Sequence, residues 1–298
     1  MSIMSFRKDN YPPLVIFAYN RPKKLENLLS SLSQNKEFKY SNVYFFVDRG
    51  VDKVNKEKNK EVIDVINKDW NCKSKKIIFN TENFGLKRNI LNGINETFKK
   101  YESAIFLEDD LIVSKSFLDF MINSLILYQK NEKIMHISGY NFPGFFGYSS
   151  SSYLSPFMNC WGWATWKDRW KKNVNFNENE ISSLTKKERR KFNIYGFEKD
   201  YESQLIRNQN KIIKTWAIFW YQFIYLNQGL CLQPVKSLVQ NTGMDGSGVH
   251  NSDQKVYEGK INDLFIKNFP KKNIFKLFHK IQIVSFYINK NLRKKLNI

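Results

Sequence analysis

The chain has 298 residues, enough for one large α/β domain or two small ones with a sizeable core. Its 25 Phe, 15 Tyr and 7 Trp exclude a disordered chain, and its formal charge of +20 favours polyanionic partners such as nucleic acid, anionic lipid or phosphorylated substrates. Three widely separated cysteines with no CxxC pair argue against a disulfide framework or a zinc site and fit a reducing compartment.

Apolar runs and helical spacings alternate through the first 140 residues. We predict strands over 13–19, 43–47, 76–79, 103–107 and 134–138, and helices over 23–34, 53–68, 87–100 and 116–129. Strands that are apolar along their whole length, alternating with helices, indicate a mainly parallel sheet covered on both faces. Ligands of such sheets bind beyond the carboxyl ends of the strands.

Polar side chains follow several of these strands directly. Asn20 and Arg21 come after the first strand, Asp48 comes after the second, and Glu108, Asp109 and Asp110 follow the fourth. Taken singly, Asn20 and Asp48 also suit a helix cap or a turn. Because these strand ends meet at one edge of the sheet, we expect the polar groups to converge there.

The acid triplet is the most specific of these signals. Three carboxylates cannot all stay ionised at close range without a compensating cation. A hard divalent metal, Mn²⁺ or Mg²⁺, is such a cation and usually brings a diphosphate with it. The alternative is a strand end followed by a solvated acidic turn.

The segment after residue 140 is rich in Gly, Ser and aromatics over 139–156, which indicates a long loop. Four tryptophans then fall within ten residues, and Trp163, Trp166 and Trp170 have the spacing of one helical face. We interpret this face as a core stripe or as a platform for a sugar ring or base. A helix over 197–208 and an aromatic stretch over 216–226 follow.

Two further segments carry candidate ligand groups. Three glycines within 243–248 make a loop whose N–H groups can approach a phosphate, and His250 beyond it is a candidate metal or phosphate ligand. Residues 261–298 interleave apolar residues with Lys and Arg. This basic amphipathic pattern suits an anionic membrane surface, or equally a helix that packs on the domain with solvated lysines.

Several motifs are absent from the sequence. It contains no GxGxxG, no GxxxxGK[ST], no GxSxG and no HExxH, which argues against a typical dinucleotide site and a P-loop nucleotidase. The first eleven residues have no apolar signal core, and no run approaches the roughly 18 apolar residues of a membrane span. We expect a cytoplasmic protein, free or peripheral on the inner face of the cell membrane.

These residues together resemble a glycosyltransferase of the GT-A fold, similar to N-acetylglucosaminyltransferase I and closer still to its bacterial-type relatives. The resemblance covers about residues 12–250. It rests on the first strand with Asn20-Arg21, on Glu108-Asp109-Asp110-Leu111 as a form of the DxD motif, and on Cys160-Trp161-Gly162-Trp163. It implies a GT-A catalytic domain over 12–255, with a nucleotide-binding half (12–110) and an acceptor-side half (111–255), followed by the basic tail (261–298).

The resemblance also implies roles for individual residues. Asp110 would bind Mn²⁺ or Mg²⁺ directly, with His250 in a late loop that closes over the diphosphate. The donor nucleotide sugar would be contacted by Asn20, Arg21, Asp48 (at uracil), Lys87, Arg88, Glu108 and Asp109. Trp161 and Trp163 would lie near the donor sugar and the acceptor.

The catalytic base is where the sequence departs from the family. The family has an Asp flanked by Trp shortly before its last strands, but Trp216-Ala217-Ile218-Phe219-Trp220 contains no carboxylate. An inverting transfer needs one carboxylate to accept the proton of the acceptor hydroxyl. Our candidates are Asp200 and Glu202, with Asp245 in reserve.

The resulting prediction is a metal-dependent, inverting hexosyl- or N-acetylhexosaminyltransferase of glycan or polysaccharide biosynthesis. It would move a sugar from a nucleotide sugar, UDP-linked, to a glycan or lipid-linked glycan, with the tail near an anionic membrane and no nucleic acid as partner. Two alternatives are a nucleotidyltransferase on a similar fold, although Asn20-Arg21-Pro22 lacks the glycines of a phosphate loop, and a non-enzymatic nucleic-acid-binding protein. The second leaves the acid triplet of a basic protein unexplained.

Overall fold

A sheet of eight strands runs through the computed structural model, which describes residues 11–143, 149–171, 184–198, 200–243, 257, 259–270 and 277–296. Its order is β3-β2-β1-β4-β8-β6-β9-β7. The strands are β1 (Leu14–Ala18), β2 (Asn42–Val47), β3 (Ser74–Phe79), β4 (Ser103–Glu108), β6 (Ile134–Ser138), β7 (Ser152–Ser155), β8 (Trp163–Trp166) and β9 (Leu230–Pro234). Only β7 and β8 run against the other six, so the expected mainly parallel α/β sheet is confirmed.

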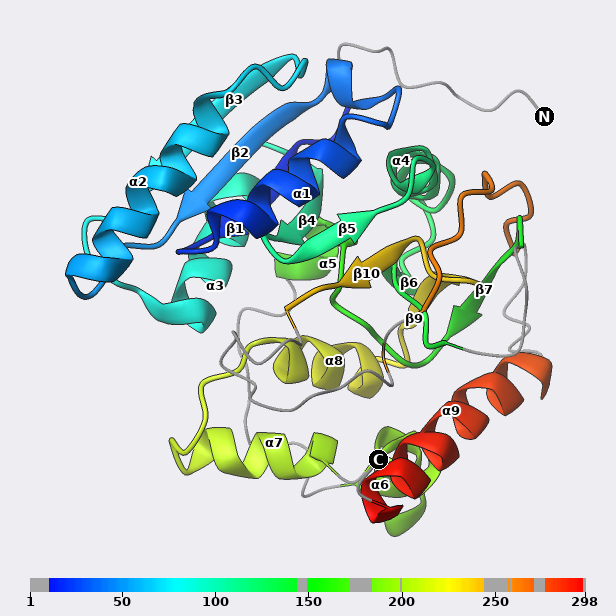
Figure 1. Ribbon diagram of the computed structural model, residues 1–298. Coiled ribbons are helices and arrows are strands. Elements are labelled where there is room, and N and C mark those ends of the chain that lie inside the picture. The colour runs from blue at the N-terminus through cyan, green and yellow to red at the C-terminus, as the bar shows by residue number, and fades with distance from the viewer. Residues whose placement is uncertain are drawn as a thin grey trace.

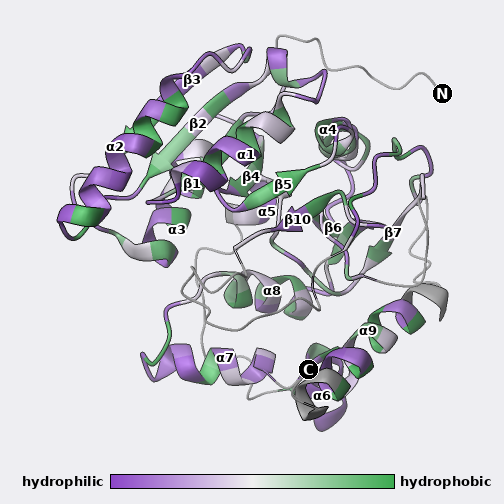
Figure 2. Ribbon diagram, viewed as in Figure 1, coloured by the Kyte–Doolittle hydropathy of each residue, from purple (hydrophilic) through white to green (hydrophobic). Residues whose placement is uncertain are grey.

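Helices cover both faces of the sheet (Figure 1). α1 (Pro22–Leu32) and α2 (Lys53–Asn67) connect strands in the direction β1-β2-β3, whereas α3 (Gly85–Phe98) returns from β3 to β4 on the far side of β1. Because parallel crossovers are right-handed, this reversal puts α3 on the face opposite to α1 and α2. The strands between these helices are apolar along their length, and Figure 2 shows them as the hydrophobic centre of the molecule.

A short antiparallel ribbon lies beside the carboxyl edge of the main sheet. β5 (Leu111–Val113) follows the acid triplet and pairs with β10 (Val239–Asn241), with Asn241 opposite Leu111. The strands have three residues each, too short for a period that the sequence could display. The ribbon brings the segment after residue 241 back to the end of β4.

The tryptophan segment differs from the expected helix. Trp163 to Trp166 form strand β8, and the helical part is confined to α5 (Lys167–Lys171). Side chains alternate along a strand, so Trp163 and Trp166 point to opposite faces of the sheet. Trp166 donates a hydrogen bond to the carbonyl of Leu125, while Trp163 stacks on Trp216 at 5.4 Å between ring centroids. The tryptophan stripe is therefore part of the core, which is the first of the two interpretations given in the sequence analysis.

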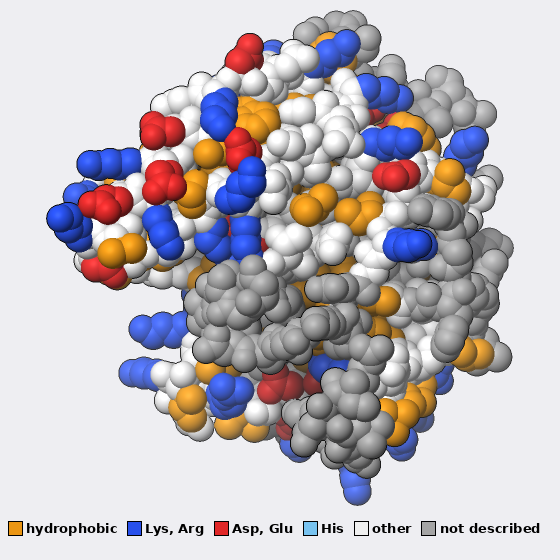
Figure 3. Space-filling view, in the orientation of Figure 1, with side chains coloured by type: hydrophobic (Ala, Val, Ile, Leu, Met, Phe, Trp, Pro, Cys, Tyr) orange, Lys and Arg blue, Asp and Glu red, His pale blue; other side chains and the backbone are white. Residues whose placement is uncertain are grey.

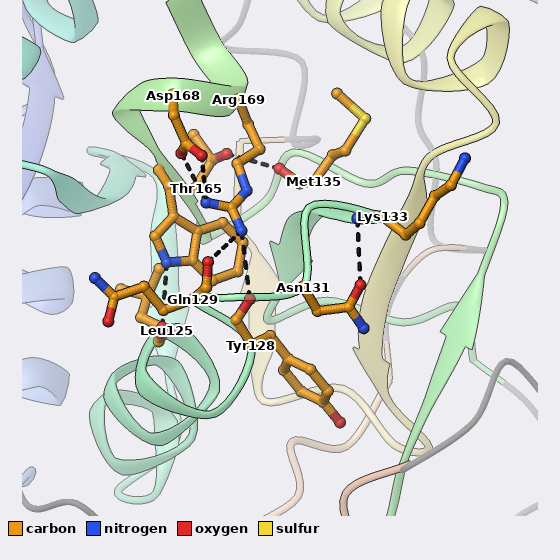
Figure 4. Close-up of polar contacts among 10 residues, drawn as sticks. Leu125, Tyr128, Gln129, Asn131, Lys133, Met135, Thr165, Asp168 and Arg169 are labelled. Atoms are coloured by element: carbon orange, nitrogen blue, oxygen red, sulfur yellow. Dashed lines mark hydrogen bonds and ion pairs between the residues drawn. The ribbon is translucent and has the colours of Figure 1, made fainter.

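α4 (Phe117–Leu127) and α8 (Ala217–Leu226) cover this half of the sheet from opposite faces. The buried guanidinium of Arg169 closes the end of α4, where it donates hydrogen bonds to the carbonyls of Tyr128 (3.4 Å) and Gln129 (Figure 4). Its other amino group pairs with Asp168 at 2.7 Å. Cationic donors at the last carbonyls of a helix stabilise that end.

The C-terminal part is attached to the same body. α6 (Lys186–Phe192), α7 (Asp200–Gln209) and α9 (Leu277–Leu296) lie below α8 in the view of Figure 1, and two short 3₁₀ turns occupy Phe38–Tyr40 and Ile194–Gly196. Residues 262–270 hydrogen-bond to the main body, for example from Asn262 N–H to the carbonyl of Ser237 and from Ser152 N–H to the carbonyl of Asn268. The described part of the tail therefore packs on the domain, as one of the two interpretations expects.

Candidate functional site

The acid triplet lies at the carboxyl edge of the sheet, between β1 and β8. Asp109 N–H donates to the carbonyl of Phe17 at 3.0 Å, and Tyr19 N–H donates back to the Asp109 carboxylate at 3.2 Å. Asp109 is thus fixed against the end of β1 by its backbone and its side chain. On the other side of β4, the register pairs Phe106 with Trp163, and the charges of Glu108 and Asp110 act on the thiol of Cys160 just before that strand.

Arg21 is the cation of this cluster. Its guanidinium contacts the Asp109 carboxylate at 2.8 Å and the Asp110 carboxylate at 3.0 Å. The three acids stand where the sequence predicts them, and the expected convergence of Arg21 with them is confirmed. Proline at the first position of α1 supports this geometry, since Pro22 starts the helix directly after Arg21.

The electrostatics of the cluster are those of crowded, buried acids. Burial and the neighbouring charges of Asp110 and Asp109 raise the pKa of Glu108 well above its usual range. Burial also raises the pKa of Asp109, against the opposing effect of Arg21. One guanidinium therefore does not compensate three carboxylates, and a second cation would stabilise their ionised forms.

Asp110 has an oxygen to offer such a cation. Its Oδ2 contacts Arg21, whereas its Oδ1 is buried and has no hydrogen-bond partner among the described residues. Mg²⁺ and Mn²⁺ prefer carboxylate oxygens, and Mg²⁺ is commonly held by one or two carboxylates together with substrate phosphates. The described residues contain no group of three His, Cys, Asp or Glu side chains arranged as a complete metal site. Asp110 fits a cation shared with a diphosphate.

The ribbon of β5 and β10 brings Thr242 into contact with the same corner. The backbone N–H and the hydroxyl of Thr242 both donate to the carbonyl of Asp110 at 2.8 Å, and Lys24 donates to the carbonyl of Thr242 at 2.8 Å. At Gly243 a Cβ would collide with the Asp110 carboxylate, so only glycine fits there. His250 and Asp245, predicted in the segment that follows, lie outside the described residues.

Asp48 has a structural role at the end of β2. Its buried carboxylate accepts hydrogen bonds from the side-chain amide of Asn80 at 3.0 Å and from the N–H groups of Phe84 and Gly85 at 2.8 Å each. The N–H of Arg49 is a fourth donor at 3.0 Å. With its oxygens used inside the chain, Asp48 holds the start of α3 against the end of β2, where a carboxylate also suits the helix dipole. The contact of Asp48 with uracil stays a prediction.

Asn20 belongs to a network of amides at the ends of β1 and β2. Its side chain donates to Asn55 at the start of α2. The buried Asn59 donates to the carbonyl of Tyr19 at 2.6 Å and accepts from Gly50 N–H at 2.5 Å. This network shapes the loops around the edge, and the sequence analysis did not single out Asn59.

The two basic residues of α3, Lys87 and Arg88, point in different directions. The ammonium group of Lys87 lies 4.3 Å from the ring centroid of Phe219 in α8, on the inner side of the helix. Arg88 instead pairs with Glu82 at 2.8 Å, and both of these side chains are largely exposed. Lys87 is therefore directed between α3 and α8, and Arg88 toward solvent.

The two candidate platform tryptophans differ in burial. Trp163 is 2% exposed and stacks on His136 and Trp216, so its ring is not open to a sugar. Trp161 is half-buried and contacts the rings of Tyr140 at 4.4 Å and Tyr257 at 5.6 Å. Of the two tryptophans, Trp161 has the exposure that a platform needs, and it directly follows Cys160, whose thiol feels the charges of Glu108 and Asp110.

Asp200 and Glu202 lie in the first turn of α7, and α8 lies between α7 and the sheet edge in Figure 1. Asp200 accepts a hydrogen bond from Gln204 at 2.8 Å. Glu202 pairs with Arg189 and accepts from the Asn193 amide at 3.2 Å. Among the described residues the structure joins neither acid to the triplet by a hydrogen bond or ion pair, in contrast to Arg21.

Cys160 and Thr242 are site residues that the sequence analysis did not select. Burial and the charges of Glu108 and Asp110 raise the pKa of the Cys160 thiol, which therefore stays protonated beside the acids. The cysteine was visible only as a neighbour of the tryptophans, and no local signal links Thr242 to Asp110. The three cysteines are all free.

Comparison with known proteins gives structural similarity alone. No protein-family model matches the chain, and no curated protein sequence matches it. Solved structures of similar fold include the mannosyltransferase PcManGT from Pyrobaculum calidifontis in complex with GDP-Man and Mn²⁺, at 9% identity, 74% coverage of this chain, 70% of that chain and a TM-score of 0.41. Another is S. aureus TarS 1-349, at 14% identity, 94% and 71% coverage and a TM-score of 0.45.

Proposed function

We propose that this protein is a metal-dependent glycosyltransferase that moves a sugar from a nucleotide sugar, UDP-linked, to a glycan or lipid-linked glycan, with inversion at the anomeric carbon. One observation carries the proposal. At the carboxyl edge of a mainly parallel sheet, Asp110 has a buried oxygen with no hydrogen-bond partner in the described part of the chain, within a triplet of acids that one arginine does not neutralise. This is the place where such sheets bind their ligands.

The residues of this corner would contact different parts of the donor nucleotide sugar. Asp110 would hold Mn²⁺ or Mg²⁺, and the ion would neutralise charge on a departing nucleoside diphosphate. Arg21 lies beside the same carboxylates and would supply a second positive charge. Glu108 and Asp109 would line the ribose and sugar, with Asn20 and Lys87 toward the nucleotide; Arg88, on the solvent side, is the weakest of the proposed contacts.

The acceptor side of the site is argued from Trp161. Trp161 directly follows Cys160, whose thiol feels the charges of Glu108 and Asp110, and its half-buried ring suits the apolar face of a sugar. For the base, Asp200 and Glu202 remain our proposals, with Asp245 and the metal ligand His250 outside the described residues. Glu202 is engaged by Arg189 and Asn193, and Asp200 by Gln204 and, at 3.8 Å, by Arg207, whose ion pair with Asp200 is the longer of the two.

The test is donor binding and turnover in the Asp110→Asn variant. For the wild type we expect Mn²⁺ and UDP together to raise the melting temperature, and a UDP-sugar to be hydrolysed or transferred only with metal. In Asp110→Asn both effects should be lost, with turnover down by about 10²–10³-fold, the usual effect of removing a group that stabilises a developing charge. The substitution is isosteric, so the melting temperature without ligand should remain similar.

Asp64→Asn is the matched control, because Asp64 is an exposed acid of α2 away from the sheet edge. This variant should behave as wild type throughout. Normal metal-dependent turnover in Asp110→Asn would overturn the proposal. So would oligonucleotide binding that needs no metal and falls steeply with salt, in a protein that shows no response to nucleotide sugars, because that is the behaviour of a nucleic-acid-binding protein.

A further inference from the structure

Helix α9 has two different faces. One face is part of the core: Ile283, Phe286 and Tyr287 are buried, and Phe286 stacks on Phe142 at 4.6 Å. Lys290 on the same side pairs with Glu198 at 2.7 Å. These contacts attach the helix to the domain, whereas the opposite face points away from it.

The opposite face carries an exposed apolar stripe. Ile281, Ile288 and Leu292 are 55%, 44% and 52% exposed. At about 100° per residue, Ile288 and Leu292 fall within about 20° of Ile281 around the helix axis, so the three form one line. Figure 3 shows hydrophobic side chains next to Lys and Arg over this helix. A line of large exposed apolar side chains marks an interaction surface.

The segment of sequence that contains this stripe carries charge of a single sign, although Lys290 lies on the opposite side of the helix, paired with Glu198. After Asp263 the chain has no further acidic residue, whereas it has nine basic ones. They are Lys267, Lys271, Lys272, Lys276, Lys280, Lys290, Arg293, Lys294 and Lys295. Each basic residue near an anionic surface adds to the attraction, and the effect falls off within a Debye length. The surface is complementary to a negative, partly apolar partner.

We propose that α9 lies flat on an anionic lipid bilayer, with Ile281, Ile288 and Leu292 in the interface between headgroups and acyl chains. A helix that combines an apolar line with basic residues and no acids binds membranes in this way. Among the described helices, none has the length and hydrophobicity to cross a bilayer. The helix therefore rests on the membrane, and its buried face carries the domain.

Two other occupants fit the same observations less well. A second copy of the chain would bring two basic C-terminal segments together, which repel each other. A nucleic acid would use the positive charge and leave the apolar stripe in water. The membrane surface alone satisfies both features, and it does so whether or not the site at Asp110 transfers a sugar.

Co-sedimentation of the full chain with lipid vesicles tests this inference. We expect binding to vesicles that contain phosphatidylglycerol, much weaker binding to pure phosphatidylcholine, and release by high salt. Replacing Ile281, Ile288 and Leu292 together by Ser should lower the partition coefficient by about tenfold or more, because it removes the buried apolar area that membrane affinity follows. Catalysis with a soluble acceptor should be unchanged, which separates this test from that of the proposed function.

The matched control replaces two apolar residues that are equally exposed elsewhere. Ile206 and Ile212 are 49% and 66% exposed, and the Ile206→Ser, Ile212→Ser variant should bind vesicles as wild type does. Circular dichroism and the melting temperature establish that both variants fold. Equal vesicle binding by the stripe variant and the wild type would overturn the proposal. So would a dimer that the stripe variant abolishes, in a protein that binds no vesicles, because the stripe would then be a contact between copies.

Discussion

At the residue scale, the central feature is the balance of charge among Arg21, Asp109 and Asp110. Arg21 contacts both carboxylates while its own side chain is only partly exposed. A buried charge that loses its partner destabilises a fold much more than the pair stabilises it. The guanidinium and a divalent ion therefore act on the same carboxylates, and either should compensate in part for the other.

Arg21→Met tests this relation. In the metal-free protein we expect a loss of about 2–4 kcal/mol in unfolding free energy, because two buried acids lose their counter-charge. Mn²⁺ should restore more stability in this variant than it adds to the wild type. Both quantities can be followed by urea denaturation with and without Mn²⁺. Arg49→Met is the control, since Arg49 is exposed and contacts only the carbonyl of Thr81 with its guanidinium. A loss in Arg21→Met that Mn²⁺ leaves unchanged would contradict the argument.

At the scale of elements, His136 joins β6 to α8. The indole N–H of Trp220 can only donate, so Nδ1 of His136 accepts this bond at 3.1 Å and is unprotonated. Nε2–H then donates to the carbonyl of Asn159 at 2.8 Å. The ring is neutral and fully buried, and burial lowers the pKa of His136 to about 3.

This lowered pKa predicts that the unfolding free energy decreases as the pH is lowered. The unfolded chain binds a proton at His136 below about pH 6.5, and the folded chain binds it only near pH 3, so the unfolding free energy falls as the pH drops between these values. The slope from this one group approaches about 1.4 kcal/mol per pH unit. In His136→Gln, which keeps a donor for Asn159 and does not titrate, the difference from wild type should shrink steadily from pH 7 to pH 4. A difference that stays constant over this range would refute the assignment.

At the scale of the whole molecule, the sheet and α9 join the two halves predicted before and after residue 110. β4 pairs with β8 and β6 with β9, so strands before and after residue 110 share one sheet. From α9, the contacts run through Phe286 and Tyr257 to Trp161 beside the acid triplet. The basic tail predicted as a separate unit is therefore packed against the aromatic side of the site.

The ion pair between Lys290 and Glu198 tests this attachment. Lys290→Met leaves the buried Glu198 without its cation, and we expect a loss of about 1–3 kcal/mol, reduced from the value for a fully buried pair by the partial exposure of the lysine. The second substitution, Glu198→Gln, should recover most of this loss in the double variant, because no unpaired charge then remains. Melting temperatures of the two single variants and the double variant give the coupling. Additive losses would show that the pair does not hold α9.

The sequence predicted the elements of the first half well for a definite reason. Strands covered on both faces are apolar throughout, and the helices between them repeat their apolar residues at helical spacing, so both signals are local. The acid triplet and Arg21 could be assigned to one edge because parallel strands end together. The short strands β5, β7, β8 and β10 carry no such period, and the spacing of Trp163, Trp166 and Trp170 fits a helical face as well as a strand followed by a helix.

What the sequence by itself determined is the mainly parallel sheet and the acids at its edge, because both follow from patterns within a few residues. Only the tertiary structure decided how the polar groups are used. Asp48 accepts hydrogen bonds from Phe84 and Gly85, more than thirty residues away. Asp110 keeps an oxygen that has no hydrogen-bond partner among the residues described, and Trp163 is buried whereas Trp161 is half-buried. Hydrogen-bond partners and burial depend on which distant segments meet, and that information is absent from any single stretch of the chain.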